Sequence, residues 1–177
     1  MGILFATNIA GMWFLASAWS KLRDPRTFSE IVPTYPLPGA LRSAHFIRAV
    51  PIFESATGLA LLSAHPRVVS LGACVALLFI ACASLMVAIR WTRGERRFRC
   101  GCGGDLAESS PAAEVLARNL GLAALLAVSV WGAGSTSYPI EAVAPALLTG
   151  CGAVIGARLA GAARSAWGFS KEWNAPG

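Results

Sequence analysis

Long apolar runs separated by short charged connectors dominate the chain. Residues 3–19, 68–89 and 119–140 contain no Asp, Glu, Lys or Arg. Each is close to the roughly 20 residues that a helix needs to cross about 30 Å of hydrocarbon. Residues 45–64 and 142–161 complete the pattern, although they are less uniformly apolar. We therefore predict an all-α integral membrane protein, with a bundle of four core transmembrane helices and a fifth, C-terminal transmembrane helix.

The connectors between these runs carry local signals of their own. Residues 26–43 are amphipathic and rich in proline, and we expect them to lie on the membrane surface, with a short helix at 27–32. Ser110 precedes Pro111, and Glu114 follows three residues later. A capping serine, a proline at the first helical position and an acid in the first turn are typical of a helix start. The fourth helix is thus predicted to begin at this point.

Composition and charge agree with a membrane location. Only 14 % of the 177 residues are charged and 55 % are hydrophobic, whereas about 25 % of a soluble domain is charged. With five spans, one side of the membrane receives 14 of the 15 Lys and Arg residues and the other receives only Arg67. The positive-inside rule then places the N-terminus outside and the C-terminus in the cytoplasm. We expect a multi-pass protein of a bacterial inner membrane, surrounded by lipid. A net charge of +6 could suggest nucleic acid, but the distribution of the basic residues argues against such a partner.

One reactive constellation stands out, the pair Cys100 and Cys102 in a polar turn between the third and fourth spans. Gly101, Gly103 and Gly104 leave the backbone of this turn free and admit a partner closely. Two thiols at this spacing can close a strained, oxidising disulfide, exchange with a partner protein, or supply part of a soft-metal site. A structural zinc site needs four ligands, and no metal site is predicted. The chemistry favoured is thiol–disulfide exchange, with an inert turn as the alternative.

Two other features bear on the thiols. Five arginines crowd the approach to the turn, namely Arg90, Arg93, Arg96, Arg97 and Arg99. A basic run of this kind is typical of a solvated face at anionic head groups, and it also favours the thiolate over the thiol. The remaining cysteines, Cys74, Cys82 and Cys151, lie inside apolar segments. They are expected to be small buried hydrophobic residues.

Glu54 lies several residues inside the second span, where a charge is costly and usually faces a partner in the bundle. Arg48 is six residues away, about 120° round an ideal helix, although a kink at Pro51 could bring the two closer. Two interpretations stay open. Glu54 is a structural residue bonded to another helix or protonated, or it is a proton relay near the thiols.

These residues resemble a known family, the MauE-like methylamine-utilisation membrane proteins, related to the DoxX-like group. The Cys-Gly-Cys turn is the most specific element of the resemblance, and the family turn usually has an aromatic residue where Gly103 stands here. The resemblance covers about residues 10–130. It rests on Ser20-Lys21-Leu22-Arg23-Asp24-Pro25 with Phe28, on Glu54 followed by Gly58-Leu59-Ala60-Leu61-Leu62, and on Arg93-Gly94 leading to Cys100-Gly101-Cys102-Gly103-Gly104 and Arg118-Asn119-Leu120.

The resemblance implies a four-helix domain over 1–135, to which residues 136–177 add a helix and a basic tail. It implies redox-associated work in the maturation of a disulfide-rich partner protein, beside a periplasmic thioredoxin-like protein. The charge asymmetry instead places the turn at the cytoplasmic face, so either the turn folds into the bundle or its thiols meet a cytoplasmic donor. The candidate catalytic residues are Cys100, Cys102 and Glu54, and the candidate binding residues are Lys21, Arg99, Gly101, Gly103, Gly104, Arg118 and Asn119.

A second class of function is also compatible with the sequence. A non-catalytic assembly or scaffold subunit would bind partner helices through small residues such as Gly152 and Gly156, with the Cys-Gly-Cys turn as a structural element. Homo-oligomers are compatible with either class. No cofactor is firmly predicted, and a quinone is left open as the electron acceptor.

Overall fold

The computed structural model describes residues 2–63, 65–99 and 109–132. The described chain is almost entirely helical, with one pair of two-residue strands. Its elements are α1 (Gly2–Arg23), α2 (Pro25–Ile31), the short 3-10 helices η1 (Val32–Thr34) and η2 (Gly39–Arg42), α3 (Ala44–Leu61), α4 (Pro66–Thr92), β1 (Arg97–Phe98), β2 (Ser110–Pro111) and α5 (Ala112–Gly132).

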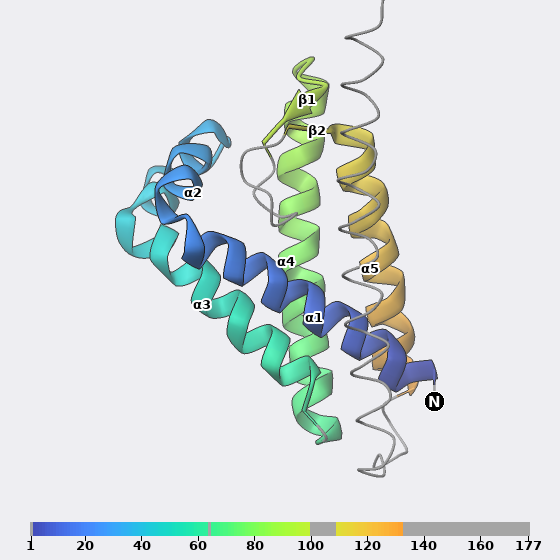
Figure 1. Cartoon of the computed structure of the whole chain (residues 1–177). Helices are drawn as coiled ribbons and strands as arrows, with labels where there is room; N and C mark the ends of the chain where they lie inside the picture. Colours follow the sequence, from blue (N-terminus) through green and yellow to red (C-terminus); the bar gives the residue numbers. More distant parts are fainter. Residues whose placement is uncertain (1, 64, 100–108, 133–177) are drawn as a thin grey trace, which may run out of the picture.

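The four long helices form a bundle of two crossed pairs (Figure 1). Helices α1 and α3 run side by side in opposite directions, and α4 and α5 form the second pair. Helix α1 also contacts α5, and α3 also contacts α4. The connector with α2, η1 and η2 lies at the end of the bundle where α1 ends and α3 begins. The arrangement brings polar residues of four helices toward one interior.

A capping residue separates α1 from α2. Asp24 accepts a hydrogen bond of 3.1 Å from the backbone N–H of Thr27, and Pro25 takes the first helical position. Hydrogen bonds from the side chain and the backbone of Thr27 hold the pKa of the Asp24 carboxyl below its ordinary value. The short helix predicted at 27–32 is confirmed as α2, which covers 25–31, and its place on the membrane surface stays a prediction.

The predicted start of the fourth helix, with Pro111 as its first residue, is wrong by one residue. Ser110 and Pro111 pair as a short antiparallel strand with Phe98 and Arg97, and α5 begins at Ala112. The backbone N–H of Ala112 donates to the carbonyl of Arg96 at 3.0 Å. The backbone of this segment therefore bonds across the chain before the helix begins, which a local capping signal does not reveal. Glu114 lies in the first turn, as expected.

Helices α1 and α3 approach closely where two glycines face each other. A Cβ placed on Gly58 would lie 2.9 Å from the carbonyl oxygen of Gly11 and 2.8 Å from Cγ of Leu15. Only a residue without a side chain fits between backbones at this separation. The close contact sets the distance between the two helices. The central core is then built from α1, α3, α4 and α5 and comprises Ala10, Phe14, Leu61, Ala73, Ala76, Ile80, Leu122 and Leu126.

The described surface exposes many large hydrophobic side chains, while the interior holds polar groups. Large hydrophobic side chains are exposed on every long helix, for example Phe53, Leu78 and Leu120. The buried polar and charged residues are Thr7, Asn8, Ser17, Lys21, Glu54, Thr57, Arg90 and Asn119. Soluble proteins rarely expose large contiguous apolar patches, whereas polar residues of membrane bundles face inward. The distribution is the one expected of a protein that lies in lipid.

The cysteines of α4 do not lie where they were expected. Cys74 and Cys82 carry free thiols and are exposed. The apolar sequence around them therefore reflects an exposed apolar face of α4 instead of a core. Cys151 lies outside the described residues.

Helices α1, α3, α4 and α5 match the first four predicted spans. Of the described helices, α4 alone has the length and composition to cross a bilayer by itself. The mostly helical architecture is therefore confirmed, and the insertion of four helices in a membrane stays a prediction. The fifth predicted helix at 142–161 lies outside the described residues.

Candidate functional site

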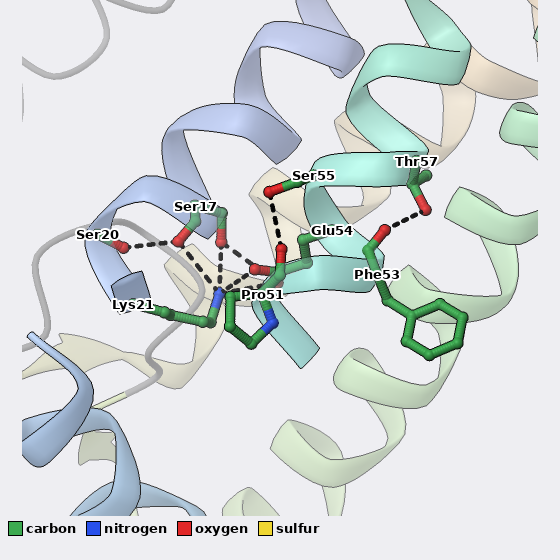
Figure 2. A network of polar contacts seen from close by, with 8 residues as sticks. All are labelled: Ser17, Ser20, Lys21, Pro51, Phe53, Glu54, Ser55 and Thr57. Atoms are coloured by element: carbon green, nitrogen blue, oxygen red, sulfur yellow. Dashed lines mark hydrogen bonds and ion pairs between the residues drawn. The ribbon is translucent and has the colours of Figure 1, made fainter. Parts of the chain in front are cut away.

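The central feature of the interior is an ion pair between Lys21, in the last turn of α1, and Glu54 of α3. The ammonium of Lys21 donates to both carboxylate oxygens of Glu54, at 2.7 and 2.6 Å. Their side chains are 2 % and 3 % exposed. Figure 2 shows the two residues pointing toward each other from neighbouring helices. The sequence placed both residues among the site candidates without pairing them.

Ser17 completes this network one turn before Lys21. Its hydroxyl oxygen accepts a hydrogen bond of 2.7 Å from the Lys21 ammonium, and the hydroxyl lies 3.4 Å from Oε1 of Glu54, to which it donates. The three N–H groups of the ammonium therefore have acceptors, and the ring of Phe28 lies 5.4 Å away. Arg48, which the sequence offered as the neighbour of Glu54, is exposed. The partner of Glu54 comes from another helix because α1 crosses α3 at this level.

A small cavity adjoins the carboxylate. It has a volume of about 30 Å³ and is lined by residues of α1, α3, α4 and α5, among them Ser17, Glu54 and Asn119. A cavity of this size with several polar neighbours can hold a water molecule. Asn119 is buried, and its amide nitrogen donates to the hydroxyl of Ser84 on α4 at 3.1 Å. Asn119, a predicted binding residue, thus lies across this cavity from Glu54.

Arg118, the neighbour of Asn119, lies with its guanidinium 5.3 Å from the ring centre of Trp13. Within the part of the chain that the structure describes, its Nε and Nη2 are buried and have no hydrogen-bond partner. A cation over an aromatic face is stabilised by the ring quadrupole. The predicted binding residues Lys21, Arg118 and Asn119 therefore lie in one polar interior, although each has its own contacts.

A second cluster lies at the end of α4 and was missed from the sequence. Arg90 is 8 % exposed, stacks on the ring of Tyr35 at 5.0 Å and donates to Thr34 Oγ1 at 2.9 Å. It also forms an ion pair with Glu95, to which its Nε donates at 2.8 Å. The hydroxyl of Tyr35 donates to the carbonyl oxygen of Arg99 at 3.3 Å. The cluster ties the proline-rich connector to the segment that leads to Cys100.

Two features therefore fix the ends of the thiol-bearing segment. Strands β1 and β2 pair just before and just after it, and Tyr35 bonds to Arg99, its last described residue on the N-terminal side. Arg99 itself is exposed, as are Arg93, Arg96 and Arg97. The other predicted site residues lie outside the described residues, namely Cys100, Gly101, Cys102, Gly103 and Gly104.

A mostly helical bundle with a polar, ion-paired interior and large exposed hydrophobic side chains is the arrangement expected of small helical membrane proteins. Comparison with known proteins makes this specific. The profile of the family described as methylamine utilisation protein MauE matches residues 2–132. The chain therefore belongs to the MauE family, and this membership supports a membrane protein associated with methylamine utilisation. No curated protein and no solved structure matches the chain.

Proposed function

We propose that this protein is a multi-pass inner-membrane thiol–disulfide redox protein that supports disulfide formation in a partner protein of methylamine utilisation. Cys100 and Cys102 are the exchanging pair in this proposal. The N-terminus is outside and the thiol turn is at the cytoplasmic face, because the basic residues gather on that side. A thioredoxin-like protein is the expected redox partner.

One observation carries the proposal, namely that the bundle anchors both ends of the thiol-bearing segment. Here β1 pairs with β2, and Tyr35, itself stacked on Arg90, bonds to Arg99 immediately before Cys100. The exposed arginines beside the segment favour thiolate over thiol and attract anionic lipid head groups.

The chemistry balances without a metal ion. A thiolate of the partner attacks the disulfide between Cys100 and Cys102 and forms a mixed disulfide. The second partner thiolate then displaces the cysteine. The partner gains a disulfide, and Cys100 and Cys102 take up its two electrons and two protons as free thiols. Glu54 is proposed as a proton relay for this step, with Lys21 as its counter-ion.

Alkylation trapping tests the proposal. Membranes are treated with a maleimide of about 5 kDa under oxidising and reducing conditions, in the host and in a strain that lacks the partner pathway. Cys100 and Cys102 should react only after reduction. The matched control is the variant with Cys74→Ser and Cys82→Ser, since both thiols are exposed on α4. If Cys100 and Cys102 stay reduced or stay unreactive in every state, the redox proposal fails.

An assembly subunit is the competing function, and one described feature favours it. Leu71, Leu78 and Leu85 are exposed at seven-residue intervals along α4, the spacing at which a helix presents one face to another helix. In this alternative the Cys-Gly-Cys turn is structural. The variant with Cys100→Ser and Cys102→Ser separates the two functions, since full activity of the host pathway with this variant would favour assembly.

A further inference from the structure

We propose that the groove between α4 and α5 binds an isoprenoid quinone, with the head group at Asn119 and the tail along the apolar surface. The groove has a volume of about 590 Å³, which lies within the range of small-molecule sites. Apart from Ser84 and Asn119, its described lining is apolar. Such a lining suits a ligand that carries one polar end on a hydrophobic body.

The groove is open to the outside of the bundle. Leu78 on α4 and Leu120 on α5 border it and are 68 % and 73 % exposed. In a membrane protein, side chains on this outer surface lie in lipid. The ligand therefore enters from the hydrocarbon phase. Entry from the hydrocarbon phase excludes charged metabolites as ligands and favours a membrane-soluble molecule.

The polar end of the ligand meets Asn119. A primary amide can make up to four hydrogen bonds, and the described structure records one for this side chain, from Nδ2 to the hydroxyl of Ser84. A further N–H is available to a ligand carbonyl. An acyl chain would fill the apolar walls but would leave the amide unused, whereas a quinone carbonyl satisfies it.

Asn119 also connects the groove to the ion pair. The same side chain lines the small cavity that holds Ser17 and the carboxylate of Glu54. A ligand carbonyl at Asn119 thus lies one residue away from the cavity that Glu54 lines, and Glu54 is the residue proposed above as a proton relay. Quinones take up protons with electrons, and lipids do not. Because Asn119 and Ile80 line both spaces, a head group at Asn119 lies next to the cavity of Glu54, which favours a quinone over a structural lipid.

The redox role of this site rests on the function proposed above, whereas the binding of a quinone in the groove does not depend on that function. When Cys100 and Cys102 are reduced, two S–H bonds break and one S–S bond forms. The two electrons and two protons reduce the quinone carbonyls to the two hydroxyls of the quinol. The disulfide is then restored for another partner protein.

Photo-crosslinking of the full-length protein in nanodiscs with an azido-ubiquinone tests the binding site. We expect the label on residues 77–84 and 116–123, with competition by ubiquinone-1 and none by farnesol, which has a tail but no quinone ring. Asn119→Leu and Leu78→Trp should each lower labelling about tenfold, through the lost hydrogen bond and the filled groove. Leu71→Trp is the matched control, because Leu71 is equally exposed two turns away on α4 and does not line the groove.

Three outcomes would overturn the site: competition by farnesol equal to that of ubiquinone-1, label confined to residues 133–177, or unchanged labelling in both groove variants. The variant with Cys100→Ser and Cys102→Ser separates the two proposals. It should bind the probe like the wild type and fail to reduce ubiquinone-1 with dithiothreitol as donor. If the wild type binds the probe but does not reduce ubiquinone-1, the redox proposal is refuted and the quinone-binding site still stands.

Discussion

Removing one member of the Lys21–Glu54 pair while keeping the other should destabilise the protein strongly. In Lys21→Met the carboxylate of Glu54, 3 % exposed, loses the ammonium that donates to both of its oxygens. An uncompensated buried charge costs about 3–5 kcal/mol. For a chain of this length, each kcal/mol corresponds to roughly 2–4 °C in melting temperature, so a fall of about 6–20 °C is expected.

The double variant with Lys21→Met and Glu54→Leu should recover most of this loss. Replacing a buried ion pair by apolar residues of similar volume is often neutral or stabilising. The measurement is thermal unfolding of the purified protein in detergent, followed by circular dichroism, for wild type, both single variants and the double variant. Arg48→Met is the control, since Arg48 is exposed and its loss should cost less than about 0.5 kcal/mol. A Lys21→Met variant within about 1 kcal/mol of wild type would refute the reasoning, because no buried charge would then have been stranded.

The same double variant distinguishes the two interpretations of Glu54. If the pair is structural, the stable double variant exchanges disulfides at the wild-type rate. If Glu54 relays protons, exchange slows although the protein stays folded, and the loss grows as the pH rises and protons become scarce. The assay is the rate at which Cys100 and Cys102 become open to alkylation during a pulse of reduced dithiothreitol, because the pair takes up protons in that direction.

Three further predictions follow from described contacts. Tyr35→Phe keeps the ring beneath Arg90 and removes the bond to the Arg99 carbonyl, so trypsin should cut after Arg99 several times faster while cleavage after Arg93 is unchanged. Gly58→Ala places a Cβ 2.9 Å from the Gly11 carbonyl oxygen and should lower the free energy of unfolding by about 1–3 kcal/mol. In the control Gly121→Ala the new Cβ meets open space, and the free energy of unfolding should rise by about 0.5–1 kcal/mol. The lowered pKa of Asp24 means that its capping contribution is present above the unfolded-state pKa and fades as the pH falls through the folded-state pKa, so the melting temperature of wild type should converge on that of Asp24→Asn in acid.

The helices could be predicted from the sequence because apolar length and proline position act locally. The charge-free runs place α1 and α4, and the Asp24-Pro25 pair separates α1 from α2. The start of α5 was one residue off because strand pairing between residues 97–98 and 110–111 is not a local property. Burial was harder to predict than the helices, because Cys74 and Cys82 were expected in the core and are exposed.

The contacts of the site could not be predicted, since they depend on how the helices cross. Lys21 and Glu54 are 33 residues apart, and their meeting follows from the close approach of Gly11 and Gly58. Arg90 was assigned to a solvated basic run, yet stacking on Tyr35 and pairing with Glu95 bury it. A tyrosine in a proline-rich connector gave no signal of this contact, because its partner lies 55 residues later.

The ion pair between the first two long helices also bears on how the chain is synthesised. Lys21 leaves the ribosome 33 residues before Glu54, so the carboxylate that pairs with its ammonium in the folded bundle is absent during that interval. An unpaired charge opposes entry into lipid. We expect α1 to wait at the mouth of the translocon until α3 has emerged, and the two to partition together as a helical hairpin.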